Sequence, residues 1–171
     1  MQRRRHLWQK LGDLRAGLAP DPSPDGLKWR MASPPDIEAL GELMLSAYRG
    51  TLDDEGETPE QACDEVRRFF DRASGPAEKS ASVVAEHDGK PVCASLCCQW
   101  DGGGRVPAGP LIAYVVTTPT HQGRGLGGSA VARSLRALAQ AGHTRIYAVI
   151  TDGNHPSEAT FRRLGFETLT D

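Results

Sequence analysis

The feature that most constrains this chain is a glycine-rich turn at residues 122–128, which reads Gln-Gly-Arg-Gly-Leu-Gly-Gly. It follows residues 111–117, whose β-branched composition predicts a buried strand, and it leads into residues 124–141, whose apolar spacing predicts a helix. Glycines leave backbone N–H groups uncovered, and the positive end of the helix dipole points to the same place. The turn therefore predicts a phosphate or pyrophosphate site, although a strand-to-helix turn also needs glycines for its geometry alone.

The spacing of the glycines decides which phosphate ligands remain. Gly123, Gly125 and Gly128 satisfy the G-x-G-x-x-G pattern of dinucleotide-binding proteins. That pattern directly follows its strand and expects an acidic residue about 20 positions later. Here residues 118–122 intervene, and residues 143–150 contain no acid. A dinucleotide site is therefore disfavoured, and the absence of G-x-x-x-x-G-K-[ST] from the sequence excludes a Walker-type NTPase.

The remaining elements alternate in a way that predicts a layered sheet. A proline at the first turn and a Thr58–Gln61 capping box start one helix, and Asp88-Gly89 predicts a hairpin. The order β-α-α-β-β-β-α-β-α-β predicts an α/β or α+β fold. The predicted strands are 27–32, 82–86, 91–100, 111–117, 145–151 and 166–169, and the predicted helices are 37–48, one after Thr58, 124–141 and 157–164.

The first 26 residues differ from the rest in composition. Leu7, Leu11, Leu14 and Leu18 recur at helical spacing, which predicts a short amphipathic helix. Residues 19–26 contain three prolines and predict an extended linker. We therefore expect a basic extension with a proline-rich linker at 1–26, and a single domain at 27–171.

Composition limits the possible partners and the compartment. The chain has 171 residues and a formal net charge of −2, which favours neither nucleic acid nor an anionic membrane as a partner. No apolar run approaches the length of a membrane span, and no apolar segment follows the basic start. Its four cysteines have neither disulfide-framework nor metal-site spacing. These features predict a cytoplasmic protein without a metal, whose thiols pack as small apolar groups.

Two motifs resemble those of the GNAT superfamily of acyl-CoA-dependent N-acyltransferases. Residues 122–127 match the family's [Q/R]-x-x-G-x-[G/A] pattern, and Pro119 precedes the turn as in that family. Asn154 and the Phe161-Arg-Arg-Leu-Gly-Phe166 segment resemble the family's second mark, an Asn followed by an aromatic-x-x-LGF helix. The resemblance covers residues 27–171.

The resemblance implies a mixed, largely antiparallel sheet in which the 111–117 and 145–151 strands splay apart. It implies that acetyl-CoA is the co-substrate, with its pyrophosphate on the turn and its pantetheine arm along the 115–117 strand. Asn154 either bonds the arm or only forms the turn. The implied CoA-binding residues are Val115, Val116, Thr117, Gln122, Gly123, Arg124, Gly125, Leu126, Gly127, Gly128, Asn154, Ser157 and Phe161.

The acid and base of the reaction are less clear from the sequence. Where the family usually places a tyrosine that protonates the departing sulfur, this chain has Phe161. A thiolate leaves tolerably without an acid, because a thiol has a pKa of about 8.5; Ser157, Tyr147 or water are the alternatives. The titratable candidates for the base are His155 and Asp152, with His121 also near a strand end, unless all three are solvated loop residues.

The resemblance implies an N-acetyltransferase that transfers an acetyl group to a primary amine of a small molecule by direct attack in a ternary complex. The alternatives are acetylation of a protein N-terminus or lysine, and a non-catalytic acyl-CoA-binding or regulatory module. The acidic residues between Asp53 and Glu65 are expected to attract a cationic amine, unless they only cap helices. A short final strand also allows a homodimer.

Overall fold

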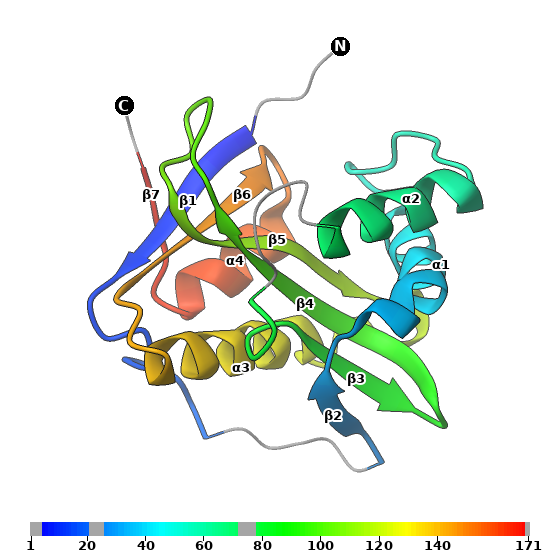
Figure 1. The fold of residues 1–171 in the computed structure, drawn as a ribbon, viewed down its shortest axis with the longest axis horizontal. Helices are drawn as coiled ribbons and strands as arrows, with labels where there is room; N and C mark the ends of the chain where they lie inside the picture. Colours follow the sequence, from blue (N-terminus) through cyan, green and yellow to red (C-terminus); the bar gives the residue numbers. More distant parts are fainter. Residues whose placement is uncertain (1–4, 21–25, 72–77, 170–171) are drawn as a thin grey trace.

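The computed structural model describes residues 5–20, 26–71 and 78–169. Seven strands form one sheet in the order β2-β3-β4-β5-β6-β1-β7, and only the β5–β6 pair is parallel (Figure 1). The predicted fold class, a mixed and largely antiparallel sheet flanked by helices, is confirmed. The strands are β1 Arg5–Leu11, β2 Lys28–Met31, β3 Val83–His87, β4 Lys90–Trp100, β5 Gly109–Thr117, β6 Arg145–Thr151 and β7 Glu167–Thr168.

The helices begin within two residues of the predicted positions: α3 at Leu126 and not at 124, and α4 at His155 and not at 157. At the start of α2, Thr58 Oγ1 accepts the Gln61 N–H and Gln61 Oε1 accepts the Thr58 N–H, so the predicted capping box is confirmed. Gly41 lets α1 approach α2 closely, because a Cβ there would lie 2.6 Å from Cys63 Sγ. The helices are α1 Ile37–Tyr48, α2 Pro59–Phe70, α3 Leu126–Gln140 and α4 His155–Arg163, with 3-10 turns η1 Pro34–Asp36 and η2 Pro119–His121.

The two faces of the sheet carry different helices. Successive residues of a strand point to opposite faces, and β4 shows this directly. Leu96 and Cys98 pack in the core under α1 and α2, whereas Cys97 packs in the core under α3 and α4. The sheet therefore separates an α1/α2 face from an α3/α4 face.

The helix predicted near the N-terminus is wrong. Arg5–Leu11 is strand β1, which pairs antiparallel with β6 from Arg5↔Thr151 to Leu11↔Arg145 and also with β7 (Figure 1). Trp8 and Lys10 alternate into the interior, whereas Leu11 is 52% exposed. Pairing with β6 therefore outweighs the helical spacing of the leucines in deciding the local structure. Residues 5–11 therefore belong to the sheet, whereas the sequence predicted that they lie in an extension outside the domain. Residues 21–25, at the centre of the predicted linker, lie outside the described part of the chain.

Lys10 joins β1 to the far end of α4. Its buried ammonium donates to the carbonyl oxygens of Ala16, at 2.8 Å, and Leu164, at 2.7 Å. Burial lowers the pKa of this ammonium, and the carboxylate of Asp13 opposes the shift. The residue just after the C-terminal turn of α4 is thereby held by a strand from the opposite end of the sequence.

Candidate active site

A gap opens in the sheet between β5 and β6. The two strands pair only at Leu111↔Tyr147 and Ile112↔Ala148. Beyond this point β5 continues to Thr117, and its other edge stays paired with β4 as far as Cys93↔Thr117. The β6-facing edge of residues 113–117 thus has no partner strand among the described residues, and the splay implied by the family resemblance is present.

A β-bulge lies at the start of the gap. Leu96 pairs with Tyr114 and Cys97 with Ile112, so Ala113 is the extra residue on β5. Consistent with this, Ala113 and Tyr114 both pack toward the α1/α2 face although they are consecutive. A bulge bends a strand and leaves its extra residue outside the ladder, so the backbone is irregular where the strands part.

The glycine turn follows the open edge. Gly123 and Gly125 have φ of +75°, a conformation that side chains disfavour, and Gly125 is the N-cap of α3. The first N–H groups of a helix have no partner within it, so the start of α3 presents donors beside the gap. Gln122 Nε2 donates to the Thr117 carbonyl at 3.0 Å, which joins the turn to the end of β5.

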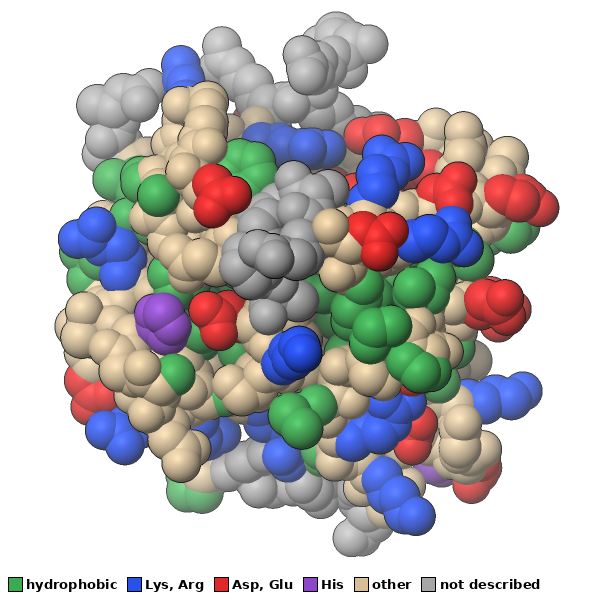
Figure 2. All heavy atoms as spheres, viewed as in Figure 1, with side chains coloured by type: hydrophobic (Ala, Val, Ile, Leu, Met, Phe, Trp, Pro, Cys, Tyr) green, Lys and Arg blue, Asp and Glu red, His purple; other side chains and the backbone are tan. Residues whose placement is uncertain are grey.

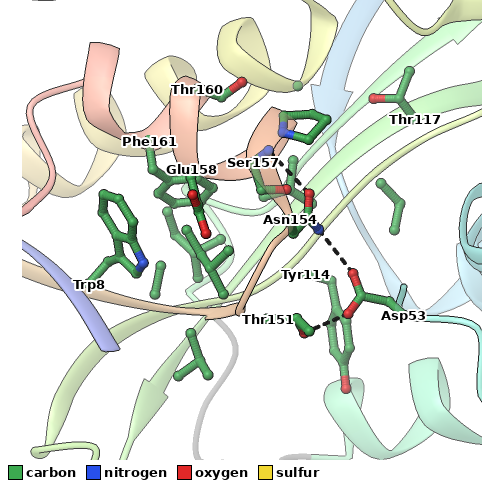
Figure 3. Close-up of a pocket in the computed structure, with 18 of the residues that line it drawn as sticks. Trp8, Asp53, Tyr114, Thr117, Thr151, Asn154, Ser157, Glu158, Thr160 and Phe161 are labelled. Carbon is green, nitrogen blue, oxygen red and sulfur yellow. Dashed lines mark hydrogen bonds between the residues drawn. The ribbon is translucent and has the colours of Figure 1, made fainter. Parts of the chain in front are cut away.

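A single cleft connects the turn, the gap and the loop between α1 and α2. Its volume is about 3160 Å³, several times that of a typical site for one small ligand. This volume has room for two substrates. Figure 3 shows part of the lining of the cleft. Of the predicted site residues it brings together Val115, Val116, Thr117, Gln122, Gly123, Gly125, Leu126, Gly127, Gly128, Asp152, Asn154, Ser157 and Phe161.

Two predicted site residues are not among those that line this cleft. Arg124 folds back on the turn, where its Nη2 donates to the Thr120 carbonyl at 3.2 Å. The His155 side chain is 85% exposed and faces Glu158 on its own helix, with 3.4 Å between Nδ1 and Oε2. The structure therefore does not bring His155 to the gap. Asp152 borders the cleft, but its side chain is 57% exposed and faces His6 at 3.5 Å.

The contacts of Asn154 and Phe161 give each of these residues a structural role. Asn154 Oδ1 accepts the Ser157 N–H at 3.2 Å, which caps α4, and its Nδ2 donates to Asp53 at 3.1 Å. Phe161 is 5% exposed, and its ring packs edge-on against Phe166 with 4.9 Å between centroids. At the position of the expected acid, the chain thus has a core residue.

His121 borders the cleft beside the turn. Its Nε2 lies 3.1 Å from His87 Nδ1, and Thr120 Oγ1 lies 2.9 Å from its Nδ1. Desolvation lowers the pKa of His121, and the positive charges of Arg124 and His87 add to the shift. His121 is therefore mainly neutral near pH 7, and its ring nitrogens face His87 and Thr120.

The opposite wall of the cleft contains side chains that the sequence did not single out. Asp53 accepts the Thr151 hydroxyl at 2.6 Å as well as the Asn154 amide, so it joins the α1–α2 loop to the end of β6 (Figure 3). The Tyr114 hydroxyl donates to Glu65 on α2. Burial, followed by this hydrogen bond, raises the pKa of Tyr114 above its usual range, so its hydroxyl stays protonated.

The sequence indicated the acidic residues from Asp53 to Glu65 as a group, and it did not distinguish Asp53 and Glu65 from the others. Figure 2 shows acidic side chains gathered over α2 and the loop before it, with basic side chains among them. Arg49 pairs with Asp54 and Arg5 pairs with Glu55. Which carboxylates are left for a ligand depends on this pairing, which the sequence does not give.

The splayed parallel pair beside a glycine turn is the architecture of the N-acyltransferase fold that the sequence resembles. A family model described as the acetyltransferase (GNAT) family matches residues 38–166, so the chain belongs to this family. No curated protein matches the chain significantly. Within the described residues, no helix has the length and apolar content to span a membrane, and no three His, Cys, Asp or Glu side chains form a group that could hold a metal.

Solved structures share this fold at low sequence identity. A GCN5-related N-acetyltransferase from Sphaerobacter thermophilus matches with a TM-score of 0.69 and 16% identity, over 96% of this chain and 48% of that one. A tandem GNAT protein from the clavulanic acid biosynthesis pathway matches with a TM-score of 0.68 and 18% identity, over 96% and 50%. This chain therefore spans about half of either protein.

A third match has a length closer to that of this chain. It is AAC(6')-Iy in complex with the bisubstrate analogue CoA-S-monomethyl-acetylneamine, with a TM-score of 0.61 and 15% identity, over 85% of this chain and 93% of that one. At such low sequence identity, these three structural similarities establish the fold alone.

Proposed function

We propose that this protein transfers an acetyl group from acetyl-CoA to a primary amine of a small molecule, by direct attack in a ternary complex. The observation that carries the proposal is the meeting, in one cleft, of the glycine turn at the start of α3 and the unpaired edge of β5. A phosphate-binding turn and an open strand edge match the two chemically different parts of CoA.

The residues present fit acetyl-CoA. The backbone N–H groups at the start of α3 are donors for the pyrophosphate, and the helix dipole adds a favourable potential. The free edge of residues 113–117 supplies main-chain groups that pair with the two amides of the pantetheine arm, as an added strand would. Added Cβ atoms at Gly123 and Gly125 would meet no atom within 4 Å, so the space above the turn is open to a ligand.

The transfer requires a neutral amine, a polarised carbonyl and a leaving group. The amine nitrogen attacks the thioester carbon, the C–N bond forms, and the C–S bond breaks with its electrons on sulfur. Backbone N–H groups near the bulge at Ala113 are positioned to polarise the carbonyl, which needs no particular side chain. Since thiolate is a tolerable leaving group, the core position of Phe161 does not prevent the reaction.

The wall of the cleft on the α1/α2 side favours a cationic acceptor. Asp53 and Glu65 line it, and the aromatic ring of Tyr114 lies between the strand and α2. AAC(6')-Iy, whose structure holds an analogue joining CoA to an acetylated aminoglycoside unit, has the same fold with an amine acceptor. A small amine therefore ranks ahead of a protein N-terminus or lysine as the acceptor of this chain.

The proposal is tested in two steps. Calorimetry is expected to detect binding of CoA and acetyl-CoA, and no binding of NAD or ATP. Thiol release is then measured with a panel of primary amines and lysine peptides, corrected for hydrolysis without acceptor. Acceleration by small amines supports the proposal, acceleration by peptides alone selects a protein acceptor, and tight binding without acceleration indicates an acyl-CoA-binding module.

A further inference from the structure

Asp53 is the side chain that reaches from the α1–α2 loop to the end of the gap. We propose that its carboxylate binds the acceptor's ammonium group and removes one proton from it before attack. This inference rests on the proposed function and adds to it a named base and an acceptor class, amines that are protonated at neutral pH. It also replaces His155, which lies outside the cleft.

The hydrogen bonds of Asp53 hold its carboxylate without neutralising it. Within the described residues its side chain accepts from two donors, the Thr151 hydroxyl and the Asn154 amide; both are uncharged, and each uses a different carboxylate oxygen. A carboxylate has about four acceptor positions, so each oxygen keeps one for a ligand. The group is thus oriented but still able to accept a charged donor.

The neighbouring acidic residues differ from Asp53 in their ionic partners. Asp54 pairs with Arg49, and Glu55 pairs with Arg5. No Lys, Arg or His nitrogen within the described ranges lies at ion-pair distance from Asp53. A partly buried carboxylate without a cation is costly unless a ligand supplies one, and an ammonium group in the cleft would do so.

The position of Asp53 relates it to the reaction. Thr151 ends β6, on the opposite side of the gap from the open edge of β5, and Asp53 faces the cleft there (Figure 3). Leu52 touches the same corner, since a Cβ on Gly153 would lie 3.8 Å from its Cδ1. An amine held by Asp53 therefore sits on the α1/α2 side of the gap, facing the strand edge where the thioester would lie.

Other titratable groups surround this position and bear on its pH dependence. Burial raises the pKa of Tyr48 above its usual range, and the negative charge of Asp53 adds to the shift. Tyr48 and Tyr114 remain protonated and do not compete as bases. The charged groups in the same surroundings are Arg5 on β1, Glu57 on the loop, Glu65 on α2 and Asp152 after β6, which faces His6.

The proton transfer balances as follows. The ammonium gives one proton to Asp53 and becomes a neutral amine, whose lone pair forms the C–N bond. The C–S bond breaks with its electrons on sulfur, the nitrogen loses its second proton to the thiolate, and Asp53 returns its own to water. The products are the acetamide, the CoA thiol and one released proton, with no further reactant needed.

The test compares Asp53→Asn with the wild type over pH 6.5 to 9.5, using an alkylamine found active in the panel. At pH 7.5 only about one part in a thousand of an alkylamine is neutral. We expect kcat/KM for the amine to fall by about 100-fold at this pH, and the loss to shrink toward tenfold as pH rises and free amine appears. The Kd for acetyl-CoA should change less than about twofold.

Two further comparisons distinguish a role of Asp53 as a base from a purely structural role in linking the α1–α2 loop to β6. Thr151→Val removes a donor to Asp53 but keeps the carboxylate, so it should cost less than about fivefold with an unchanged pH profile. Glu60→Gln makes the same charge change in the acidic segment outside the cleft and should behave as the wild type. With trifluoroethylamine, which is neutral at pH 7.5, the Asp53→Asn loss should largely disappear.

Each outcome is decisive. Equal, pH-independent losses in Asp53→Asn and Thr151→Val, or a full loss with trifluoroethylamine, would overturn the base role and leave Asp53 as a structural tie. An active wild type with an unaffected Asp53→Asn variant would overturn this inference alone. A wild type that binds acetyl-CoA but acetylates no amine would overturn the proposed function and this inference with it.

Discussion

The two walls of the cleft are built in different ways. At the glycine turn the useful groups are backbone N–H donors, supplied by a continuous segment in which Gly123 and Gly125 have φ of +75°. At the opposite wall, which we propose binds the acceptor, they are side chains, and Asp53 meets Thr151 and Asn154 from a distant part of the sequence. A site built from backbone shows its geometry in local residue spacing, whereas a site built from distant side chains depends on the completed fold.

The largest effect is expected from changing backbone geometry at the turn. Gly125→Val places a β-branched side chain at φ of +75°, where non-glycine residues are strained by about 1–2 kcal/mol, and the first turn of α3 must shift to relieve it. Losing two hydrogen bonds to a charged group costs about 1.5–3 kcal/mol for each bond. Calorimetry should therefore show acetyl-CoA binding weakened by at least about 100-fold.

Gly142→Val is the matched control for that experiment. Gly142 has φ of +89° just beyond the other end of α3, and like Gly125 it has no atom within 4 Å of an added Cβ. The two variants should lose similar stability in urea denaturation, and only Gly125→Val should lose binding. Equal affinities would show that the turn does not hold the pyrophosphate.

A smaller effect is expected from side chains deeper in the acceptor wall. Tyr114→Phe removes the hydrogen bond between α2 and β5, and Glu65→Gln replaces its charged acceptor by a neutral amide oxygen. Since both residues face the acceptor, kcat/KM for the amine should fall by about tenfold, corresponding to a loss of about 1–2 kcal/mol. Steady-state kinetics with both substrates varied would test this, and an equal change in the KM for acetyl-CoA would contradict the division between the walls.

Removing a single side chain from the glycine turn should have a smaller effect on acetyl-CoA binding. Gln122→Ala removes the hydrogen bond to the Thr117 carbonyl but keeps every backbone donor of the turn. We expect the Kd for acetyl-CoA to rise by about threefold, close to the net value of one neutral hydrogen bond. A loss as large as that of Gly125→Val would mean that the Gln122 side chain, rather than the backbone, controls this wall.

The smallest effect is expected at His155. Its ring is exposed and faces Glu158 rather than the cleft. His155→Ala should change kcat and its pH profile by less than about twofold, since it removes only an exposed contact with Glu158. Loss of the acidic limb of the pH profile in this variant would restore His155 as a candidate base.

Much of the fold followed from local patterns in the sequence. The Thr58–Gln61 box, the Asp88-Gly89 hairpin and the strand before the glycine turn each predicted an element that the structure contains. The family motif also predicted the separation of β5 and β6. These features succeed because capping, tight turns and buried strands are decided within about ten residues.

The failures have a common physical cause. The leucine spacing after Arg5 predicted a helix, but the open edge of β6 made a strand the better arrangement for those residues. Asp53 could not be separated from its acidic neighbours, because the ion pairs of Asp54 and Glu55 form only in the folded chain. The β1–β6 pairing and the Arg5–Glu55 ion pair are both contacts between distant parts of the sequence.

The position of β1 has a consequence for how this protein folds. Its residues are synthesised before those of the other strands of the sheet, and their partners in β6 follow more than 130 residues later. Contacts so distant in sequence slow folding, since the loop entropy must be lost before they form. Until Arg145–Thr151 is synthesised, β1 has no strand to pair with. We expect the sheet to close late, with the acceptor side of the gap, which ends at Thr151, among the last parts to become ordered.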